Sequence, residues 1–392
     1  SWEQRKFDKW GDFYYGHSCP KWSVTEDATI PCIRYGELYT KFGAKIDKVY
    51  SYTNMPTEKL RFSKGTEVLI PRVGEDPMDY NHCTWLSLKD VAIGEMISVF
   101  NTDQDPLFSA TMFNATLQKE FAIRVEGGSV TNLYFDKLRN IDISYPLLAE
   151  QKKIAAFFEN LDHLITLHQR KYDKLQIIKK AMLEKMFPQN GSCFPEIRFK
   201  GFTDSWEQRK FDKWGDFYYG HSCPKWSVTE DATIPCIRYG ELYTKFGAKI
   251  DKVYSYTNMP TEKLRFSKGT EVLIPRVGED PMDYNHCTWL SLKDVAIGEM
   301  ISVFNTDQDP LFSATMFNAT LQKEFAIRVE GGSVTNLYFD KLRNIDISYP
   351  LLAEQKKIAA FFENLDHLIT LHQREVEKLQ NIKKSMLETM FV

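Results

Sequence analysis

The sequence predicts an α+β protein with two mixed α/β domains and two long helices. First, residues 1–170 recur without a single change as residues 205–374. Second, each copy ends in a segment whose apolar residues alternate at spacings of three and four, the pattern of a helix that packs on another helix. Third, the rest of each copy has short β-rich runs separated by Gly, Pro, Asp and Asn, as in a compact mixed domain.

The repeat divides the 392 residues into five parts. Its period is too long for a solenoid unit, so each copy is a whole domain plus a helix. We expect the first domain, its helix, a linker, the second domain and the second helix at residues 1–147, 148–187, 188–204, 205–351 and 352–392. The linker contains "PEIRFKGFTD", a lead-in that has no counterpart before the first copy in this sequence.

Local patterns predict the elements of one domain. The runs "IPCIRY", "TEVLIP", "MISVF" and "KEFAIRV" predict strands because they are short, apolar and bounded by turn residues. Two segments, "DPLFSATMFNATLQ" and "NLYFDKLRN", have helical spacing, and the second follows a Gly-Gly-Ser turn at residues 127–129. This mixture favours an α+β domain over an all-β domain.

The segment after each domain predicts a helix of about 38 residues, a rod of roughly 55–60 Å. Pro146 can begin the first such helix, and Pro188 must end it. Such a helix cannot bury its apolar stripe, the seam, by itself, so we expect the two helices to pair. The alternative is a helix buried inside one globular domain. The helix-pairing residues are expected to be Ile154, Phe158, Leu161 and Ile165 in the first copy and Ile358, Phe362, Leu365 and Ile369 in the second.

Composition excludes several classes of protein. The formal net charge is -3 overall, -3 for residues 1–149 and +3 for residues 150–204, so no region is basic enough to bind DNA by charge alone. Seven cysteines without a C-x-x-C pair predict reduced thiols in the cytoplasm rather than a disulfide framework or a structural zinc site. The apolar runs are shorter than the roughly 20 residues that a membrane span needs.

Motifs for catalysis are weak. No phosphate loop and no G-x-G-x-x-G fingerprint occur, and "EDPMDY" lacks the consecutive prolines of an adenine methyltransferase motif. His82 and Cys83 are adjacent, and such a pair could be the base and nucleophile of a hydrolase. Neighbours in an extended segment point to opposite faces, so a buried cysteine beside an exposed histidine is the simpler interpretation.

Three segments combine basic, aromatic and small polar side chains, which can touch phosphates or read base edges. They are "IRYGELYTKFGAKIDK", "PRVGEDPMDYNHCTW" and "EGGSVTNLYF", the last being a turn before a helix that could cradle a phosphate. An ordinary solvated loop is the alternative for each. The candidate DNA-binding residues are Arg34, Tyr35, Lys41, Lys45, Arg72, Tyr80, Asn81, His82, Ser129, Thr131 and Asn132, with their counterparts Arg238, Tyr239, Lys245, Lys249, Arg276, Tyr284, Asn285, His286, Ser333, Thr335 and Asn336.

Together, these features resemble the DNA-specificity subunit of type I restriction-modification systems. The resemblance rests on "PLLAEQKKIAAFFENLDHLITLHQRK", on "IIKKAMLEKMFP" shortly after it, and on "PEIRFKGFTDSWEQRK" at the start of the second domain. Their order covers essentially the whole chain: domain, helix, domain, helix.

The resemblance implies a cytoplasmic subunit that catalyses nothing by itself. Each of its two target-recognition domains would read a short half-site in double-stranded DNA. The helices would pair as an antiparallel coiled coil with pseudo-two-fold symmetry and set the spacer between the half-sites. Methyltransferase subunits, expected to be two, would use S-adenosylmethionine, and restriction/translocase subunits would use ATP and Mg²⁺. No cofactor is expected on this chain itself.

One departure from the family sharpens the expectation. Recognition domains in this family usually differ, whereas these two are identical. Identical readers related by a two-fold axis predict an inverted-repeat target. Two further alternatives are the recognition subunit of a related system that combines methylation and cleavage in another subunit, and a twin-domain scaffold that binds a protein or glycan instead of DNA.

Overall fold

The computed structural model describes residues 2–189 and 191–391, which form two compact units. Unit 1 comprises the described residues of 1–169 and 374–392, and unit 2 comprises those of 170–373. Each unit therefore contains one α+β domain and a segment of each long helix. The division falls inside the helices rather than at the expected domain ends, because the ends of both helices pack on the domain cores.

Two sheets form the framework of the domain in unit 1. The larger has the order β2-β11-β7-β9-β4, and the smaller has the order β5-β3-β10-β6. The internal strand β11 pairs antiparallel with both neighbours, β2 and β7, and Val99 lies opposite Tyr14 and Leu69. The strand bounds are Gly11–Tyr15 (β2), Ile97–Thr102 (β11), Glu67–Pro71 (β7), Thr84–Leu86 (β9), Lys45–Ile46 (β4), Ser51–Thr53 (β5), Ile30–Ile33 (β3), Lys89–Ile93 (β10) and Phe62–Lys64 (β6).

Two small sheets complete the strands of unit 1. Strand β1 (Glu3–Lys6) pairs antiparallel with β14 (Asp142–Tyr145), which joins the start of the domain to its end. The other small sheet has the order β12-β13-β8 and joins two loop regions that are far apart in sequence. Its bounds are Glu126–Gly127 (β12), Thr131–Asn132 (β13) and Val73–Gly74 (β8).

The helix α2 (Pro106–Thr116) is the centre of the larger core. It begins at an N-cap, Asp105, whose carboxylate accepts a hydrogen bond from the Phe108 N–H at 2.8 Å, and Pro106 occupies the first turn. Residues 107–113 are all buried, including Ser109 and Thr111, so most of this helix is surrounded by the core. The helix predicted from "DPLFSATMFNATLQ" is confirmed.

One predicted strand is wrong. The run "KEFAIRV" lies in helix α3 (Gln118–Ala122) and the turn after it. The Phe121 N–H donates to the Leu117 carbonyl at 2.8 Å, and Phe121 is buried, while Ile123 is exposed. Phe121 lies four residues after Leu117, which is the spacing of one helical turn. In a run this short, the same apolar residues also fit a strand. The three other predicted strands are confirmed as β3, β7 and β11.

Unit 2 repeats this framework. Its sheets have the orders β16-β25-β21-β23-β18, β19-β17-β24-β20, β15-β28 and β22-β27-β26. The strand bounds are Glu207–Lys210 (β15), Asp216–Tyr219 (β16), Ile234–Ile237 (β17), Lys249–Ile250 (β18), Ser255–Thr257 (β19), Phe266–Lys268 (β20), Glu271–Pro275 (β21), Val277–Gly278 (β22), Thr288–Leu290 (β23), Lys293–Ile297 (β24), Ile301–Asn305 (β25), Glu330–Gly331 (β26), Thr335–Asn336 (β27) and Asp346–Tyr349 (β28). The short helices are α1 (Tyr35–Thr40) in unit 1 and α5 (Tyr239–Thr244), α6 (Pro310–Thr320), α7 (Gln322–Ala326) and α8 (Phe339–Leu342) in unit 2.

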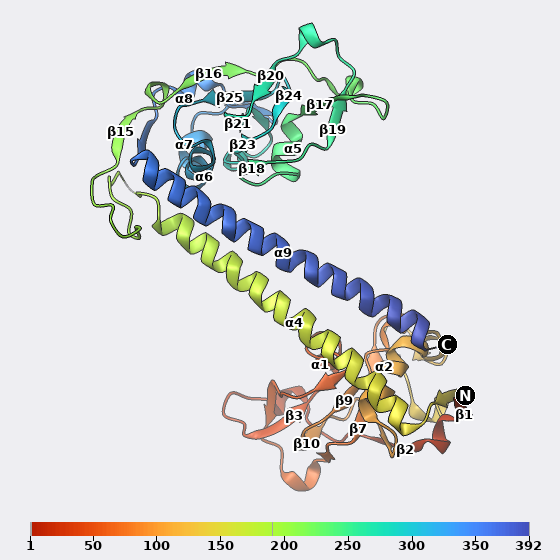
Figure 1. Cartoon of the computed structure of the whole chain (residues 1–392). Coiled ribbons are helices and arrows are strands. Elements are labelled where there is room, and N and C mark those ends of the chain that lie inside the picture. The colour runs from red at the N-terminus through yellow and green to blue at the C-terminus, as the bar shows by residue number, and fades with distance from the viewer. Residues whose placement is uncertain (1, 190, 392) are drawn as a thin grey trace. The chain divides into compact units, whose positions relative to one another are not determined.

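Two long helices, α4 (Leu148–Lys185) and α9 (Leu352–Met390), confirm the helical seam prediction. Within each unit a segment of α4 and a segment of α9 lie side by side and antiparallel (Figure 1). In unit 1, Asp162 of α4 pairs with Lys383 of α9 at 2.5 Å. In unit 2 the equivalent pair has its members on the opposite helices: Lys179 of α4 pairs with Asp366 of α9 at 2.5 Å.

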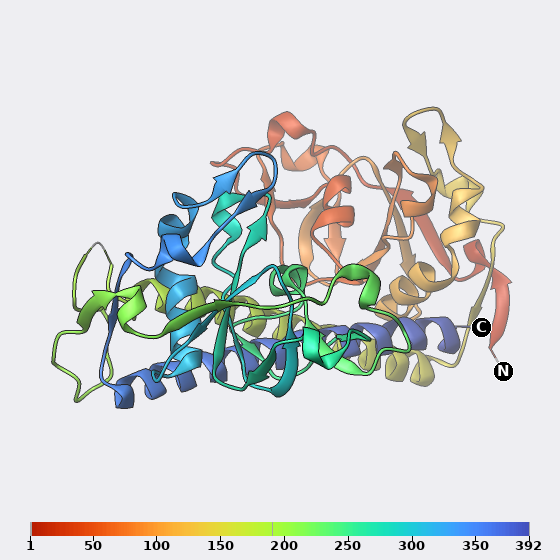
Figure 2. The same cartoon turned by 90° about the horizontal axis from the view of Figure 1, so that it is seen from above.

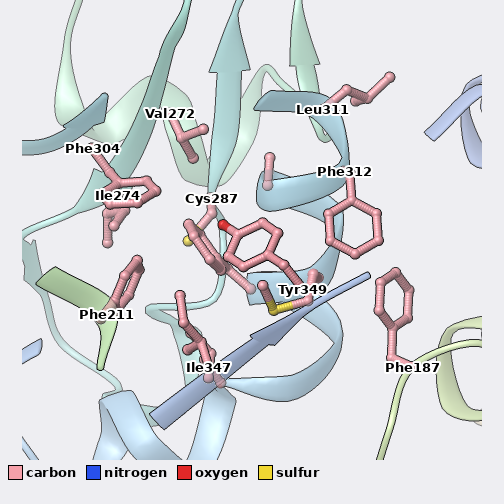
Figure 3. Close-up of a cluster of buried hydrophobic side chains, with 14 of the residues drawn as sticks. Phe187, Phe211, Val272, Ile274, Cys287, Phe304, Leu311, Phe312, Ile347 and Tyr349 are labelled. Atoms are coloured by element: carbon pink, nitrogen blue, oxygen red, sulfur yellow. The ribbon is translucent and has the colours of Figure 1, made fainter. Parts of the chain in front are cut away.

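The helix ends complete the domain cores. In unit 1 the helix segments lie along one side of the domain (Figure 2), and Phe391 of α9 stacks on Phe158 of α4 with centroids 5.8 Å apart. In unit 2, Phe187 at the end of α4 takes the equivalent place. It stacks on Phe362 with ring centroids 5.8 Å apart. Its ring also lies beside that of Phe312 of α6 (Figure 3), with centroids 5.7 Å apart.

The predicted helix-pairing residues are mostly buried, and some of them belong to a domain core as well as to a long helix. Seven of them are buried, namely Ile154, Phe158, Leu161, Ile358, Phe362, Leu365 and Ile369, and Ile165 is half-buried. The clusters that contain Ile154, Phe158 and Leu161 also contain side chains of the domain core. Helix pairing alone therefore does not describe these residues, because each helix start is also part of its own domain.

Candidate nucleic-acid interface

The first predicted segment forms α1 and the turn after it. Arg34 is the N-cap residue of α1, and its backbone N–H donates to the Glu37 Oε2 at 2.8 Å. Tyr35 and Lys41 are exposed. The Lys41 ammonium lies 5.9 Å from the ring centroid of Tyr50, a half-exposed tyrosine that also lies 5.2 Å from Lys48. The surface beside α1 thus presents cations over an aromatic ring, an arrangement that suits phosphate contact and base stacking.

Lys45 does not belong to that surface. Its ammonium pairs with the Glu159 carboxylate of α4 at 2.5 Å and lies 4.9 Å from the Trp85 ring. The counterpart Lys249 pairs with Glu363 at 2.5 Å. The expectation that Lys45 and Lys249 bind DNA stays a prediction, and in this structure both ammonium groups pair with glutamates of the long helices.

The second predicted segment divides into a buried part and an accessible part. Tyr80 is fully buried, and its hydroxyl donates to the Thr131 carbonyl at 2.6 Å. Asn81 donates its side-chain amide to the Asn114 carbonyl at 3.0 Å. The His82 Nδ1 lies 2.6 Å from the Asp79 carbonyl, and its ring lies 5.2 Å from that of Tyr39.

These contacts correct part of the prediction for this segment. Tyr80 cannot reach a DNA base while its ring fills the core and its hydroxyl is bonded, and the same holds for Tyr284, which donates to the Thr335 carbonyl at 2.6 Å. Asn81 and His82, with their counterparts Asn285 and His286, are only partly buried. Asn81, His82 and Asn285 have backbone carbonyls as hydrogen-bond partners.

The third predicted segment is a hairpin rather than a helix start. Ser129 is exposed at the tip between β12 and β13, and its counterpart Ser333 is exposed in the same way. Asn132 in β13 and Asn336 in β27 are half-buried. Thr131 is buried and donates its hydroxyl to the Gly74 carbonyl at 3.1 Å, and Thr335 repeats this bond to Gly278. The helix expected from "NLYFDKLRN" is a single turn at Phe135–Lys137 in unit 1 and at α8 in unit 2. The expected phosphate cradle at a helix N-terminus is therefore wrong.

The small sheet brings the three segments together around β8. The Tyr39 hydroxyl of α1 donates to the Val73 carbonyl at 3.0 Å, and β13 pairs with β8. The Leu133 N–H donates to the Arg72 carbonyl at 2.8 Å. A single short strand thus holds α1, the hairpin and Arg72 in one fixed arrangement, although they come from residues 34 to 134 of the chain.

Arg72 is the centre of this arrangement. Its guanidinium lies 4.7 Å from the Tyr15 ring centroid and 5.2 Å from that of Tyr134, so two aromatic rings contact one cation. Its Nη1 donates weakly to the Glu95 carbonyl at 3.4 Å, and its Nε makes no hydrogen bond within the described chain. Arg276 repeats the arrangement with Tyr219 at 4.7 Å and Tyr338 at 5.4 Å.

The cation and aromatic contacts continue on both sides of Arg72. Tyr15 lies 4.4 Å from Phe135, and Phe135 lies 5.2 Å from the Arg139 guanidinium. On the other side, Arg61 lies 5.0 Å from the Tyr14 ring and donates to the Tyr15 carbonyl at 2.6 Å. We name Arg61, Tyr14, Tyr15, Arg72, Tyr134, Phe135 and Arg139 the arginine–aromatic row.

The sequence reasoning missed most of the arginine–aromatic row. Only Arg72 was among the candidates, because the partners lie in three separate strands and turns. The one local signal was "DFYYG", which has adjacent tyrosines next to a glycine. Burial raises the pKa of Tyr15, and burial with the nearby Glu67 raises the pKa of Tyr14 to about 12. At neutral pH both hydroxyls therefore stay protonated and uncharged, which suits contact with an anionic backbone.

Stacked arginines of this kind can read nucleic-acid bases. A guanidinium whose faces contact aromatic rings keeps donors along its edge, and those donors can bond guanine in the plane of the base. The rings also restrict the side chain before binding, which lowers the entropy lost on contact.

The arrangement of Cys83 does not support a Cys/His hydrolase. Cys83 is fully buried, and burial raises the pKa of its thiol, which keeps the thiol protonated and non-nucleophilic. Among residues 2–189 and 191–391, no three His, Cys, Asp or Glu side chains are grouped so that they could hold a metal ion. Of the helices described, none is both long and apolar enough to span a membrane.

Thiol titration provides a test of this burial. Six of the seven cysteines are buried, and Cys193 is partly exposed. Because Cys83 and Cys287 are fully buried and burial raises their pKa, we expect an aromatic disulfide reagent at pH 8 to modify Cys193 rapidly and Cys83 and Cys287 only on unfolding. Rapid reaction of Cys83, or a hydrolytic activity that Cys83→Ser abolishes, would contradict this interpretation.

Comparison with known proteins gives concordant matches. The sequence model described as the type I restriction modification DNA specificity domain matches residues 90–176 and again residues 294–381. A putative type I restriction enzyme MjaX specificity subunit of Methanocaldococcus jannaschii is 24% identical over 261 residues, covering 65% of this chain and 59% of the relative. The MjaVIII specificity subunit of the same organism is 22% identical over 267 residues, covering 64% of this chain and 61% of the relative. The match thus spans about 60% of the length of these curated relatives.

Solved structures share the fold. The S subunit of a type I restriction-modification system from M. genitalium aligns with a TM-score of 0.61 at 14% identity, covering 100% of this chain and 96% of that chain. A chain from a structural study of type I R-M complex assembly and conformational transition aligns with a TM-score of 0.51 at 15% identity, covering 100% of this chain and 97% of that chain. The fold, with two repeated domains and two long helices, is therefore shared with the M. genitalium S subunit.

Proposed function

We propose that the chain, which matches the type I restriction modification DNA specificity domain twice, is a DNA-specificity subunit that reads a bipartite double-stranded DNA target and catalyses nothing by itself. The observation that carries this proposal is the arginine–aromatic row, present once in each of the two domains. It provides preorganised donors for base edges at two places in one chain.

The proposal assigns the chemistry to partner subunits. Two methyltransferase subunits would bind S-adenosylmethionine and methylate adenine at N6, and restriction/translocase subunits would use ATP and Mg²⁺. The long helices would be the scaffold for these partners, and the chain itself would hold no cofactor. With a net charge of -3, the chain alone should bind DNA weakly, and the partners should supply most of the phosphate contacts.

The target should be an inverted repeat. Identical residues form the row in both domains, so both domains should read the same half-site. The helices exchange roles between the units, with Asp162 paired to Lys383 and Asp366 paired to Lys179. Identical domains related by a two-fold axis would face opposite directions along DNA.

Selection from random duplexes, with the chain bound to its methyltransferase partner, tests the proposal. We expect enriched sequences with a half-site, a fixed spacer and the reverse complement of that half-site. Two unrelated half-sites or a direct repeat would contradict the inverted arrangement. Absence of any salt-sensitive DNA binding would contradict a DNA function and favour a twin-domain scaffold. Copurification with a single combined methylase and nuclease subunit would identify the related system instead.

A further inference from the structure

Two buried thiols of each domain are in contact with one another. Cys19 lies in the loop after β2, and Cys32 lies in β3, an internal strand of the smaller sheet. Cys19 is 4% exposed and Cys32 is 0% exposed. The two thiols are hydrogen-bonded to each other, and Cys223 and Cys236 repeat the pair in unit 2. Two sulfur atoms in such contact need only a small further approach to form a disulfide.

The surroundings of the pair suit a disulfide better than a metal ion. Cys19 and Cys32 form a small apolar cluster with Ala92. The partly buried side chains that pack against this cluster are Val24, Ile30, Leu60 and Phe62. None of the groups of His, Cys, Asp and Glu within residues 2–189 and 191–391 could hold a metal ion, whereas a structural zinc site needs four such ligands. The pair therefore has sulfur chemistry available to it without a third ligand.

The two thiols differ in reactivity. The hydrogen bond between them lowers the pKa of Cys19 and raises that of Cys32, and burial raises the pKa of Cys32 further. Cys32 is thus the donor and the Cys19 sulfur the acceptor. Burial and Glu95 oppose the lowered pKa of Cys19, and Arg34 supports it. Since the thiolate is the nucleophile in thiol chemistry, Cys19 is the sulfur that attacks and Cys32 the one that completes the bond.

The loop that carries Cys19 has an unusual backbone. Ser18 and Cys19 both have a φ of +62°, in a region that residues other than glycine seldom adopt. Neighbouring backbone holds the loop there. The His17 N–H donates to the Ile93 carbonyl at 2.7 Å, and the Glu95 N–H donates to the Ser18 carbonyl at 2.9 Å. Such strain persists only where the surroundings fix it, and it is concentrated at functional sites.

The same loop supports the arginine–aromatic row. It follows directly after Tyr15, whose ring contacts Arg72. Glu95, whose N–H bonds the Ser18 carbonyl, offers its own carbonyl to the Arg72 Nη1 at 3.4 Å. The position of the loop is therefore linked to Arg72 both along the chain and through Glu95.

We propose that Cys19 and Cys32, and equally Cys223 and Cys236, form a reversible disulfide that fastens the loop at residues 16–20 to β3. We name each pair a cysteine clasp. This inference does not depend on the proposed DNA function, because the sulfur chemistry is measured without DNA.

A peroxide is the oxidant that the clasp requires. The Cys19 thiolate attacks one peroxide oxygen and becomes a sulfenic acid, and the other oxygen leaves as hydroxide. The Cys32 sulfur then attacks the sulfenic sulfur, and its proton leaves with the sulfenic oxygen as water. Two electrons thus pass from the two sulfurs to hydrogen peroxide, which is reduced to water. A dithiol reverses the reaction by thiol–disulfide exchange and is itself oxidised.

Mass spectrometry of the full chain tests the clasp. The chain carries Cys193→Ser, so that the partly exposed thiol cannot cross-link two molecules. It is treated with hydrogen peroxide, and the remaining thiols are then alkylated in denaturant. We expect both clasp thiols of each domain to be lost to alkylation, the Cys19 and Cys32 peptides to be cross-linked, and dithiothreitol to restore them. Cys83, which is fully buried, is the internal reference and should stay open to alkylation.

Variants in one domain separate the roles of the two sulfurs. In Cys32→Ser, Cys19 should stop at the sulfenic acid, which dimedone traps, while the clasp of Cys223 and Cys236 still closes in the same molecule. In Cys19→Ser, Cys32 should stay reduced, because it is fully buried and its pKa is raised. Thermal unfolding of each variant identifies a folding defect, and Cys32→Ala replaces Cys32→Ser if a hydroxyl in the apolar cluster causes one.

Hydrogen exchange measures whether the disulfide fastens the loop. The His17 and Glu95 amides, which bond the loop to its neighbours, should exchange more slowly in the oxidised chain than in the reduced chain. Clasp thiols that stay reduced at a peroxide concentration that oxidises them in the unfolded chain would overturn the proposal. So would a disulfide that forms only after unfolding, or exchange at these two amides that oxidation leaves unchanged or makes faster.

Discussion

Replacing Arg72 and Arg276 together with alanine is expected to abolish most of the base preference of the chain on DNA. Each guanidinium is held against two tyrosine rings, and its Nη1 makes only a weak hydrogen bond to a backbone carbonyl at 3.4 Å. Loss of one bidentate base contact costs about 1–3 kcal/mol, and contacts at well-separated positions add. Competition binding on the selected duplex, in the presence of the methyltransferase partner, measures the loss.

The single variants provide internal controls. Because the two domains are identical, Arg72→Ala and Arg276→Ala should cost the same affinity, and each should relax the preference in one half-site only. Arg72→Lys keeps the charge but loses the planar fork, so it should resemble Arg72→Ala if the residue reads a base and resemble the unchanged chain if it only touches phosphate.

A stability measurement completes this prediction. The thermal unfolding midpoints of the arginine variants should stay close to that of the unchanged chain, so that lost binding reports on recognition. Unchanged affinity and unchanged base preference in the double variant would remove the arginine–aromatic row from the interface.

Phe158→Asp is expected to cost about 3–5 kcal/mol of unfolding free energy or more in unit 1, because it removes a buried aromatic and buries an unpaired charge. Phe158 is 1% exposed and stacks on Phe391. Leu164→Asp, on the same helix at 40% exposure, is the matched control and should cost far less.

Hydrogen exchange locates the damage. In Phe158→Asp, amides at residues 374–390 should lose protection, because that end of α9 belongs to unit 1. Phe362→Asp should instead expose the end of α4, where Phe187 stacks on Phe362. Normal protection of residues 374–390 in Phe158→Asp would show that the stacking contributes little.

The long-range architecture was predictable from the sequence because its signals are long. A perfect repeat and a seam sustained along each helix are redundant patterns, and a few misleading residues do not alter them. The run "KEFAIRV" failed because a short apolar run fits a strand and a helical turn equally well, and packing of Phe121 beside α2 decided between them.

The candidate interface was only partly predictable. Polar residue types identified the right loops, and Arg72 is central in the structure. Residue type cannot show that the Tyr80 hydroxyl bonds the Thr131 carbonyl or that Lys45 pairs with Glu159, because both contacts depend on tertiary packing. The aromatic partners of Arg72 were missed for the same reason, since Tyr15 and Tyr134 lie far from it in sequence.

The contribution of Phe391 to unit 1 has a consequence for the order of folding during synthesis. Unit 2 is one continuous stretch, residues 170–373, whereas unit 1 also needs residues from 374 onwards. A ribosome that adds about 5–20 residues per second would release the first domain well before the helix end that completes its core. Unit 2 can therefore complete its folding before unit 1, although its domain is synthesised later. Phe158 stays partly exposed to solvent until the last turn of α9 has emerged from the ribosome.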